Sequence, residues 1–196
     1  MSSEKSWPTR HRETLWLIAS LVLLLIVTAL LLRLEGRLWI CACGTIKAWV
    51  GNTCSSDNSQ HVLDPFSFTH VLHGIAFYWI IGWLGARLRS LWQILLAVAV
   101  ECAWEVFENT NFVIDRYRTA TAALGYTGDT VINATGDILC CLAGFLIAKR
   151  LGFWRSLVVF LLVELMLILW IKDSLLLQIL MLISPIAAIK NWQTCP

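Results

Sequence analysis

The stretch FSFTHVLHGIAFYWIIGWLG, residues 66–85, is long and apolar enough to cross a bilayer as one helix. About 20 mainly apolar residues span the hydrocarbon core in that conformation. The stretch nevertheless carries two imidazoles, those of His70 and His73, within its first turns. Because ionisable side chains inside a membrane are costly, the two histidines predict polar partners on neighbouring helices.

The composition of the whole chain is that of an integral membrane protein. Of its 196 residues, 58% are hydrophobic and 14% are charged, and the mean hydropathy is +0.71. Soluble domains have about 45–50% apolar and about 25% charged residues. The net charge of +2 is too small and too scattered to indicate nucleic-acid binding. The length favours one membrane domain over residues 1–196.

Five apolar runs are long enough to be transmembrane helices. Their approximate bounds are residues 14–33, 66–85, 91–109, 129–148 and 154–171. A sixth run, about 174–189, is short and contains Pro185, so it either spans with a kink or lies at the interface. The first run is expected to remain as an anchor, because no small-residue cleavage site follows it. The expected fold is an all-α polytopic helix bundle with five or six transmembrane helices.

Lysines and arginines near the helix ends predict a cytoplasmic N-terminus. The short basic connections ARLRS, residues 86–90, and AKRLGFWR, residues 148–155, would then lie on the cytoplasmic side. Two longer connections, about 34–65 and 110–128, would lie on the outer side. In the first of them, Cys54 is expected to pair with Cys41 or Cys43, because cysteines separated by one residue pair poorly. Free interfacial thiols are the alternative.

Three of the expected helices carry several polar side chains on one face. Under the alternating topology, all three groups fall in the same outer half of the membrane. They must face one another, since this many ionisable groups facing lipid would be prohibitive. The groups are His70 and His73; Glu101, Glu105 and Glu108; and Asp129, Asn133 and Asp137.

This convergence favours a metal site, because imidazole and carboxylate ligands suit zinc, iron or manganese. Glu101 or Asp137 would act as a general base or support the ligands. Two alternatives remain: a proton or ion pathway, and a structural polar network that joins the helices. The expected ligands are His70, His73, Glu105, Glu108 and Asp129.

The connection after residue 109 carries two arginines at the level of this site, Arg116 and Arg118. Arginines in such positions commonly bind lipid phosphates. We expect both of them, with Asn133, to hold an anionic headgroup if the site is catalytic. Ordinary interfacial anchoring beside Tyr117 is the alternative.

Six segments together resemble an uncharacterised bacterial family of small multi-pass inner-membrane proteins, uncharacterised protein family three-one-four. The segments are GRLWICACG, SFTHVLHG, ECAWEVFEN, IDRYRTAT, GYTGDTVINATGD and MLISPIAAIKNWQ. The resemblance covers residues 37–193 and implies a multi-pass protein of the bacterial inner membrane. The layout is also similar, more distantly, to that of VanZ-type membrane proteins. The sequence therefore predicts either a metal-assisted enzyme for a lipid or lipid-linked substrate, or a non-enzymatic membrane protein that binds a lipid or partner or acts as a small transporter.

Overall fold

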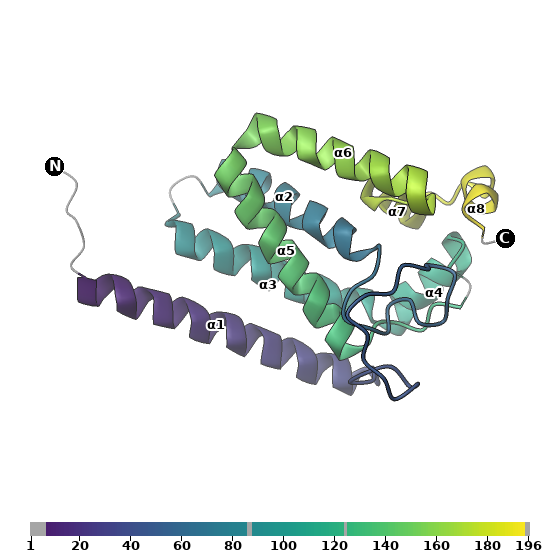
Figure 1. Ribbon diagram of the computed structural model, residues 1–196, viewed down its shortest axis with the longest axis horizontal. Coiled ribbons are helices and arrows are strands. Elements are labelled where there is room, and N and C mark those ends of the chain that lie inside the picture. Colours follow the sequence, from purple (N-terminus) through teal and green to yellow (C-terminus); the bar gives the residue numbers. More distant parts are fainter. Residues whose placement is uncertain (1–6, 86–87, 124, 195–196) are drawn as a thin grey trace.

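The computed structural model describes residues 7–85, 88–123 and 125–194, and these residues form helices joined by loops (Figure 1). The described residues contain no β-strand beyond one isolated bridge, between Trp49 and Leu63. In chain order the helices are α1 (Trp7–Leu34), α2 (Ser67–Leu84), α3 (Ser90–Glu108), α4 (Asn111–Ala120), α5 (Val131–Leu151), α6 (Phe153–Ile171), α7 (Leu175–Ile183) and α8 (Ala187–Gln193).

Within the described residues, four helices are long and apolar enough to cross a membrane: His11–Leu34 of α1, and α3, α5 and α6. The fifth predicted helix is present as α2, with 18 residues. The all-helical class is therefore confirmed. Hydropathy alone predicted these five helices well, because each is a continuous apolar run bounded by polar or glycine residues.

Of the two alternatives for the C-terminal run, the structure favours the one in which it does not span. The run is interrupted around Pro185 and forms α7, of nine residues, and α8, of seven residues, which continues to Gln193. At about 1.5 Å per residue, neither helix is long enough to span a bilayer. Proline ends α7 because it lacks an N–H donor and restricts the residue before it. The connection after α3 also contains a helix, α4, whose N-cap Thr110 accepts a hydrogen bond from the Val113 N–H.

Helices α2 and α5 pack with their backbones in contact, and glycine makes this approach feasible. A Cβ atom added to Gly74 would lie 1.9 Å from the carbonyl oxygen of Cys141. One added to Gly144 would lie 2.0 Å from the carbonyl oxygen of Val71. Small residues permit this kind of close helix packing in membranes. The α2–α5 pair thus forms the centre of the bundle.

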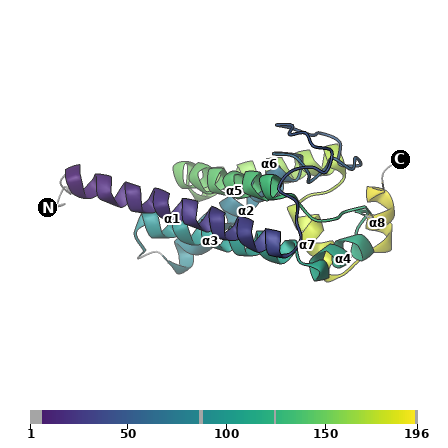
Figure 2. The same ribbon diagram turned by 90° about the horizontal axis from the view of Figure 1, so that it is seen from below.

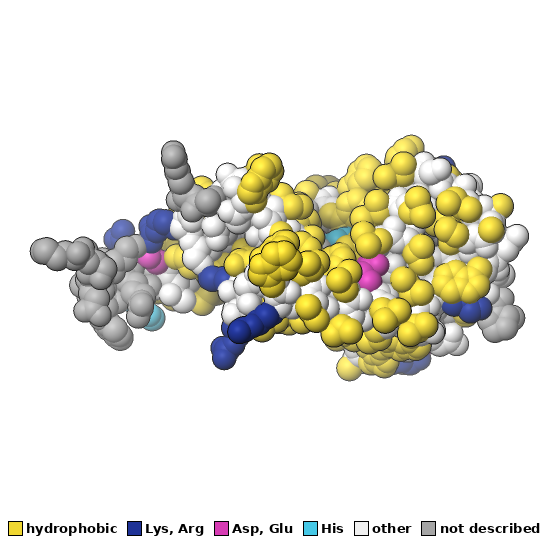
Figure 3. Space-filling view, turned by 90° about the horizontal axis from the view of Figure 1, so that it is seen from above, with side chains coloured by type: hydrophobic (Ala, Val, Ile, Leu, Met, Phe, Trp, Pro, Cys, Tyr) yellow, Lys and Arg dark blue, Asp and Glu magenta, His cyan; other side chains and the backbone are white. Residues whose placement is uncertain are grey.

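The other long helices pack around this pair. Helix α1 runs along α3, with Leu21, Leu24 and Leu25 against Val98 and Cys102 (Figure 2). Helix α6 packs on α2 through Phe160, Leu167 and their neighbours. The remaining faces of α1 and α6 expose many leucine, isoleucine and valine side chains. Hydrophobic side chains cover much of the face seen in Figure 3. Such an apolar belt suits contact with a bilayer.

One end of the bundle gathers the loop of residues 35–66 with α4, α7 and α8 (Figure 1). We call it the loop end. The opposite end holds the α2–α3 turn and the α5–α6 junction at Gly152. The predicted orientation depends on the basic connections 86–90 and 148–155. Their described basic residues lie at this opposite end, and they are Arg89, Lys149, Arg150 and Arg155. Arg87 lies outside the described residues.

The predicted pairing of Cys54 with Cys41 or Cys43 is wrong. Cys41 and Cys43 form a disulfide with each other, and their Cα atoms are 5.1 Å apart. A tight turn brings them together, because the Gly44 N–H donates to the carbonyl oxygen of Cys41 at 3.0 Å. Gly44 has a φ of +73°, a conformation that favours glycine. The pairing therefore depends on the path of the backbone in this loop.

Candidate functional site

The two histidines of α2 meet Glu101 of α3 inside the bundle. The Nδ1 atom of His70 lies 2.5 Å from Glu101 Oε1, and the Nδ1 atom of His73 lies 3.2 Å from each oxygen of that carboxylate. Glu101 is completely buried, and His70 is 6% exposed. The structure thus brings together the two imidazoles of α2 and one of the predicted carboxylates.

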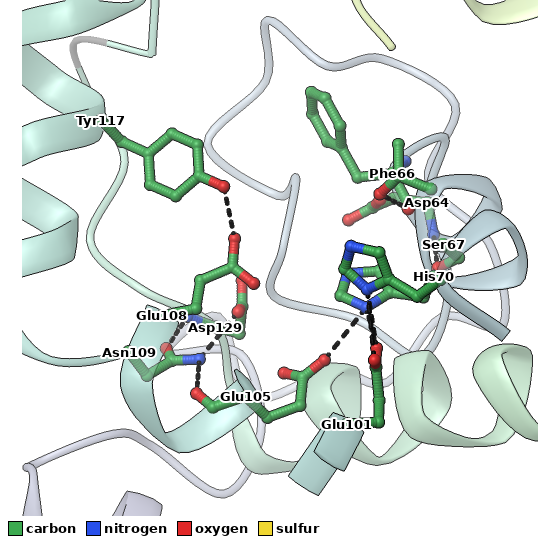
Figure 4. A network of polar contacts seen from close by, with 12 residues as sticks. Asp64, Phe66, Ser67, His70, Glu101, Glu105, Glu108, Asn109, Tyr117 and Asp129 are labelled. Atoms are coloured by element: carbon green, nitrogen blue, oxygen red, sulfur yellow. Dashed lines mark hydrogen bonds and ion pairs between the residues drawn. The ribbon is translucent and has the colours of Figure 1, made fainter. Parts of the chain in front are cut away.

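Two more carboxylates follow along α3 toward the loop end. Glu105 is completely buried, and its Oε1 atom lies 3.2 Å from His70 Nδ1. No hydrogen-bond donor within the described residues reaches either oxygen of Glu105. Glu108 accepts a hydrogen bond from the Tyr117 hydroxyl at 2.7 Å (Figure 4). Its other oxygen is buried, and none of the described residues forms a hydrogen bond with it. These carboxylates have acceptor capacity that the described side chains leave unused.

Asp129 is held at the start of α5 by residues that the sequence did not single out. The Asn109 side chain donates to Asp129 Oδ2 at 2.9 Å and accepts the Asp129 N–H at 2.7 Å (Figure 4). The Tyr126 hydroxyl lies 3.1 Å from both Asp129 oxygens. Burial, followed by the nearby Glu108 carboxylate, raises the pKa of Asp129 to about 7. Its buried position therefore favours the protonated form of this carboxyl group.

Asp64 is a further buried carboxylate, and it was not among the residues predicted from the sequence. It lies just before α2 and accepts the N–H groups of Ser59 and Phe66, each at 2.8 Å. Burial raises the pKa of Asp64 despite these two donors. The sequence DPFS at residues 64–67 contains the signal, because an Asp followed by Pro commonly precedes a helix. Asp137 of α5 is 4% exposed, and its Oδ1 atom has no partner within the described residues.

A cavity of about 520 Å³ opens from this site at the loop end. Tyr117 and Tyr126 line it beside His70, and serine, threonine and amide side chains form much of the remaining wall. Its described lining contains no Lys or Arg. The carboxylates of the lining are Asp64, Glu108, Asp129, Asp137 and Asp173.

None of the three predicted substrate-binding residues is part of this lining. The Arg116 Nε–H donates to the carbonyl oxygen of Leu182 in α7 at 2.8 Å. The Arg118 Nε–H donates to the carbonyl oxygen of Tyr126 at 2.6 Å. Asn133 is 1% exposed, and neither polar atom of its side chain has a partner within the described residues. The two guanidinium groups support the wall of the cavity from outside.

The side chains form two groups that can hold a metal ion, and His70 belongs to both. One group is His70, His73 and Glu101, and the other is His70, Glu105 and Glu108; within each group the ligand atoms lie within 4.8 Å of one another. Asp129 is in neither group. Imidazole nitrogen and carboxylate oxygen are the donors that zinc, iron and manganese share, so the donor set fits a divalent metal.

Comparison with known proteins identifies the family. Residues 32–195 match the family described as "Protein of unknown function (DUF2585)". The chain belongs to the DUF2585 family. This match includes every residue of the site, whereas most of α1 precedes it. No solved structure is significantly similar to the chain.

The relatives of this DUF2585 member are bacterial proteins called UPF0314 protein. One from Sphingopyxis alaskensis is 42% identical over 182 residues, covering 92% of this chain and 95% of the relative. One from Sinorhizobium fredii is 45% identical over 186 residues, covering 94% and 93%. One from Paracoccus denitrificans is 39% identical over 193 residues, covering 98% of both. These matches confirm the resemblance to uncharacterised protein family three-one-four.

Proposed function

We propose that the protein is a five-span protein of the bacterial inner membrane and a metal-assisted enzyme for a lipid or lipid-linked substrate. Its N-terminus would be cytoplasmic, and its loop end would face the opposite side. Four helices of spanning length support this proposal. So does α2, because it packs against α5, α3 and α6 as a fifth member of the bundle.

The observation that carries the proposal is the state of Glu105. This carboxylate is completely buried, and within the described residues it accepts no hydrogen bond. The His70 imidazole lies at ion-pair distance, 3.2 Å, and a second carboxylate, that of Glu108, lies close by. Removing a carboxylate from water is costly unless a cation or a proton compensates it. A divalent metal held by His70, Glu105 and Glu108 would provide that compensation, and zinc, iron or manganese suits these ligands.

The remaining residues take roles that follow from their positions. Glu101 contacts the Nδ1 atoms of both histidines and orients their rings, as carboxylates do beside metal-binding imidazoles. Asp137 lines the cavity, and its Oδ1 atom has no hydrogen-bond partner within the described part of the chain, so it is our candidate for the general base. Asp129 borders the ligand set and is held by Asn109 and Tyr126. When bound, the metal would supply a Lewis acid for the reacting group of the substrate.

The charge of the cavity restricts the substrate. Its described lining has five carboxylates and no Lys or Arg, so it would repel a phosphate group unless a cation offsets this charge. A metal at the inner wall would provide this offset. The serine, threonine and amide groups of the outer wall can bind the polar part of a headgroup. Arg116 and Arg118 would act by holding the wall of the cavity in place.

Elemental mass spectrometry on the protein purified in mild detergent tests the proposal. The wild type should contain near-stoichiometric zinc, iron or manganese. A His70→Ala, His73→Ala double variant should lose it, while His11→Ala, a change to an exposed histidine of α1, should retain it. Three well-folded samples without metal would refute the metal site.

The second candidate is a non-enzymatic membrane protein that binds a lipid or partner, or moves a small solute, in which the same residues form a structural network. The contacts of Glu101 with His70 and His73 favour it, because they join α2 to α3 without any metal. This candidate predicts an unchanged thermal unfolding temperature in the presence of a chelator. The metal-site proposal predicts that the chelator lowers that temperature.

A further inference from the structure

We propose that the Cys41–Cys43 disulfide is a thiol–disulfide exchange site for a dithiol at the loop end. This site lies in the loop of residues 35–66 and does not depend on the function proposed for the acidic cavity. Cys41 is 7% exposed, whereas Cys43 is exposed. An attacking thiolate therefore has access to the sulfur of Cys43 and not to that of Cys41. Exposed disulfides are the ones that exchange readily.

The leaving sulfur already has a hydrogen-bond donor. The N–H of Cys43 donates to Cys41 Sγ at 3.1 Å. This contact persists when the disulfide opens, provided that the turn from Cys41 to Gly44 keeps its backbone hydrogen bond. A donor aimed at a sulfur favours its thiolate form and so makes it a better leaving group.

His61 supplies a second donor beside the disulfide. It is 1% exposed, and its Nδ1 atom accepts the Lys47 N–H at 3.1 Å. A neutral imidazole that accepts at Nδ1 carries its proton on Nε2. The Nε2 atom has no hydrogen-bond partner within the described residues, and Asp57 Oδ2 lies 3.7 Å away from it.

The four side chains around this point are close together. Both sulfur atoms, a carboxylate oxygen of Asp57 and one ring nitrogen of His61 all lie within 4.8 Å of one another. The Lys47 ammonium group pairs with Asp57 at 2.5 Å, which offsets the negative charge beside the sulfurs. The buried imidazole and this ion pair together provide a polar surrounding for a thiolate at Cys41.

The exchange has two balanced steps. A thiolate of the incoming dithiol attacks Cys43 Sγ, the Cys41–Cys43 bond breaks, and its electron pair leaves on Cys41 Sγ. The second thiolate of the dithiol then attacks the mixed disulfide and releases Cys43. The dithiol is oxidised to a disulfide, Cys41 and Cys43 are reduced, and the two protons of the dithiol end on the two cysteines.

Reduced Cys41 and Cys43, with Asp57 and His61, also have the residue types of a zinc site. The tautomer argues against that use. An Nε2 atom that carries a proton has no lone pair for a metal, and moving the proton to Nδ1 would break the contact with the Lys47 N–H. Tight zinc binding by the reduced protein would therefore overturn the exchange proposal.

Two single-substitution variants of the full chain in detergent test the proposal. Cys41→Ser leaves the exposed Cys43, and Cys43→Ser leaves the buried Cys41. Each is incubated with oxidised glutathione, and the adduct is located by peptide mass spectrometry. Cys43 should react at least tenfold faster than Cys41, and the buried thiol of Cys102 should stay unmodified in both variants. Equal rates at Cys41 and Cys43 would contradict the proposed direction of attack.

A second measurement tests the role of His61 in the wild-type disulfide. Dithiothreitol should reduce the folded protein at neutral pH, and His61→Leu should slow this reaction about tenfold at an unchanged unfolding temperature. An equal rate in a folded His61→Leu variant, or a disulfide that resists dithiothreitol in the folded wild type, would overturn the proposal. If His61→Leu does not fold, the comparison of the cysteine variants still decides it.

Discussion

Asn109 is the residue that connects the elements around the acidic site most directly. Its side chain reaches the carbonyl oxygen of Glu105 in its own helix and both the carboxylate and the N–H of Asp129. It is completely buried. Nothing in the sequence distinguishes it as a site residue, because it follows Glu108 at the end of an apolar run, where an asparagine commonly ends a helix.

We expect Asn109→Ala to lower the free energy of unfolding by about 2–3 kcal/mol, because it leaves the Asp129 N–H and carboxylate buried without their partner. Unfolding by a denaturing detergent measures this change. Asn133→Ala is the matched control, since the polar atoms of that side chain have no partner to lose within the described residues. Similar losses in both variants would contradict the role assigned to Asn109.

Asp173, between α6 and α7, makes stability depend on pH. Burial raises the pKa of this carboxyl group to about 6, and the Ser174 N–H donates to it at 2.8 Å. An unfolded Asp has a pKa of about 3.9, so the folded protein binds the proton more tightly. Between these two values, stability must fall as the pH rises.

The Asp173→Asn variant should therefore lose less stability than the wild type as the pH rises from about 4 to about 6. These limits are the pKa of Asp173 in the unfolded protein, about 3.9, and in the folded protein, about 6. Thermal unfolding across this range measures the difference between the two proteins. The pKa values of Asp64 and Asp129 are raised in the same way in both proteins, so their effects on stability cancel in the comparison. Parallel pH profiles would show that Asp173 does not contribute.

At the scale of the elements, the contact between α2 and α5 is the most sensitive to side-chain size. Gly144→Ala would place a methyl group 2.0 Å from the Val71 carbonyl oxygen, so the helices must separate. We expect a loss of about 3 kcal/mol in the free energy of unfolding. Gly82→Ala is the control in α2, because nothing lies within 4 Å of its added Cβ.

The Gly82→Ala variant should be neutral or gain up to about 1 kcal/mol, since alanine favours a helix over glycine. Unfolding in denaturing detergent compares the two variants under the same conditions. If Gly144→Ala is well tolerated, the backbones of α2 and α5 are too far apart for a Cβ atom at Gly144 to clash with the Val71 carbonyl oxygen.

Apolar runs predict the long helices closely. They do not predict the shorter helices, because length and composition alone do not decide the structure of those segments. The run at 174–189 is as apolar as a span, yet Pro185 divides it into α7 and α8. Helix α4 is short and carries charged residues, so hydropathy did not reveal it. Its signal was local, in the N-cap Thr110 and the amphipathic sequence that follows.

In the molecule as a whole, helix periodicity and alternating topology predict that the polar residues of α2, α3 and α5 lie at the same depth. The structure places His70 of α2 in contact with Glu101 and Glu105 of α3. The part contributed by loops was not predictable in the same way. Asp64 and Tyr126 lie in irregular segments, whose path depends on tertiary contacts and not on a repeating pattern. The Cys41–Cys43 pairing escaped prediction for the same reason.

The five-span proposal predicts that the two chain termini lie on opposite sides of the membrane. A reporter enzyme that is active only outside the cytoplasm should be inactive at the N-terminus and active when fused to the C-terminus. A fusion after Gly36, at the loop end, is the control and should also be active. An inactive C-terminal fusion beside an active control would refute the five-span topology.

The backbone contact between α2 and α5 also has a mechanical consequence. His70 and His73 lie on α2, and Asp137 lies on α5. At Gly74 and Gly144 the two backbones are in direct contact, without side chains between them whose rearrangement would let the helices slide past each other. The two helices must therefore move as one rigid body. A conformational change that admits a ligand would involve α3 and the loop end, which hold the remaining carboxylates.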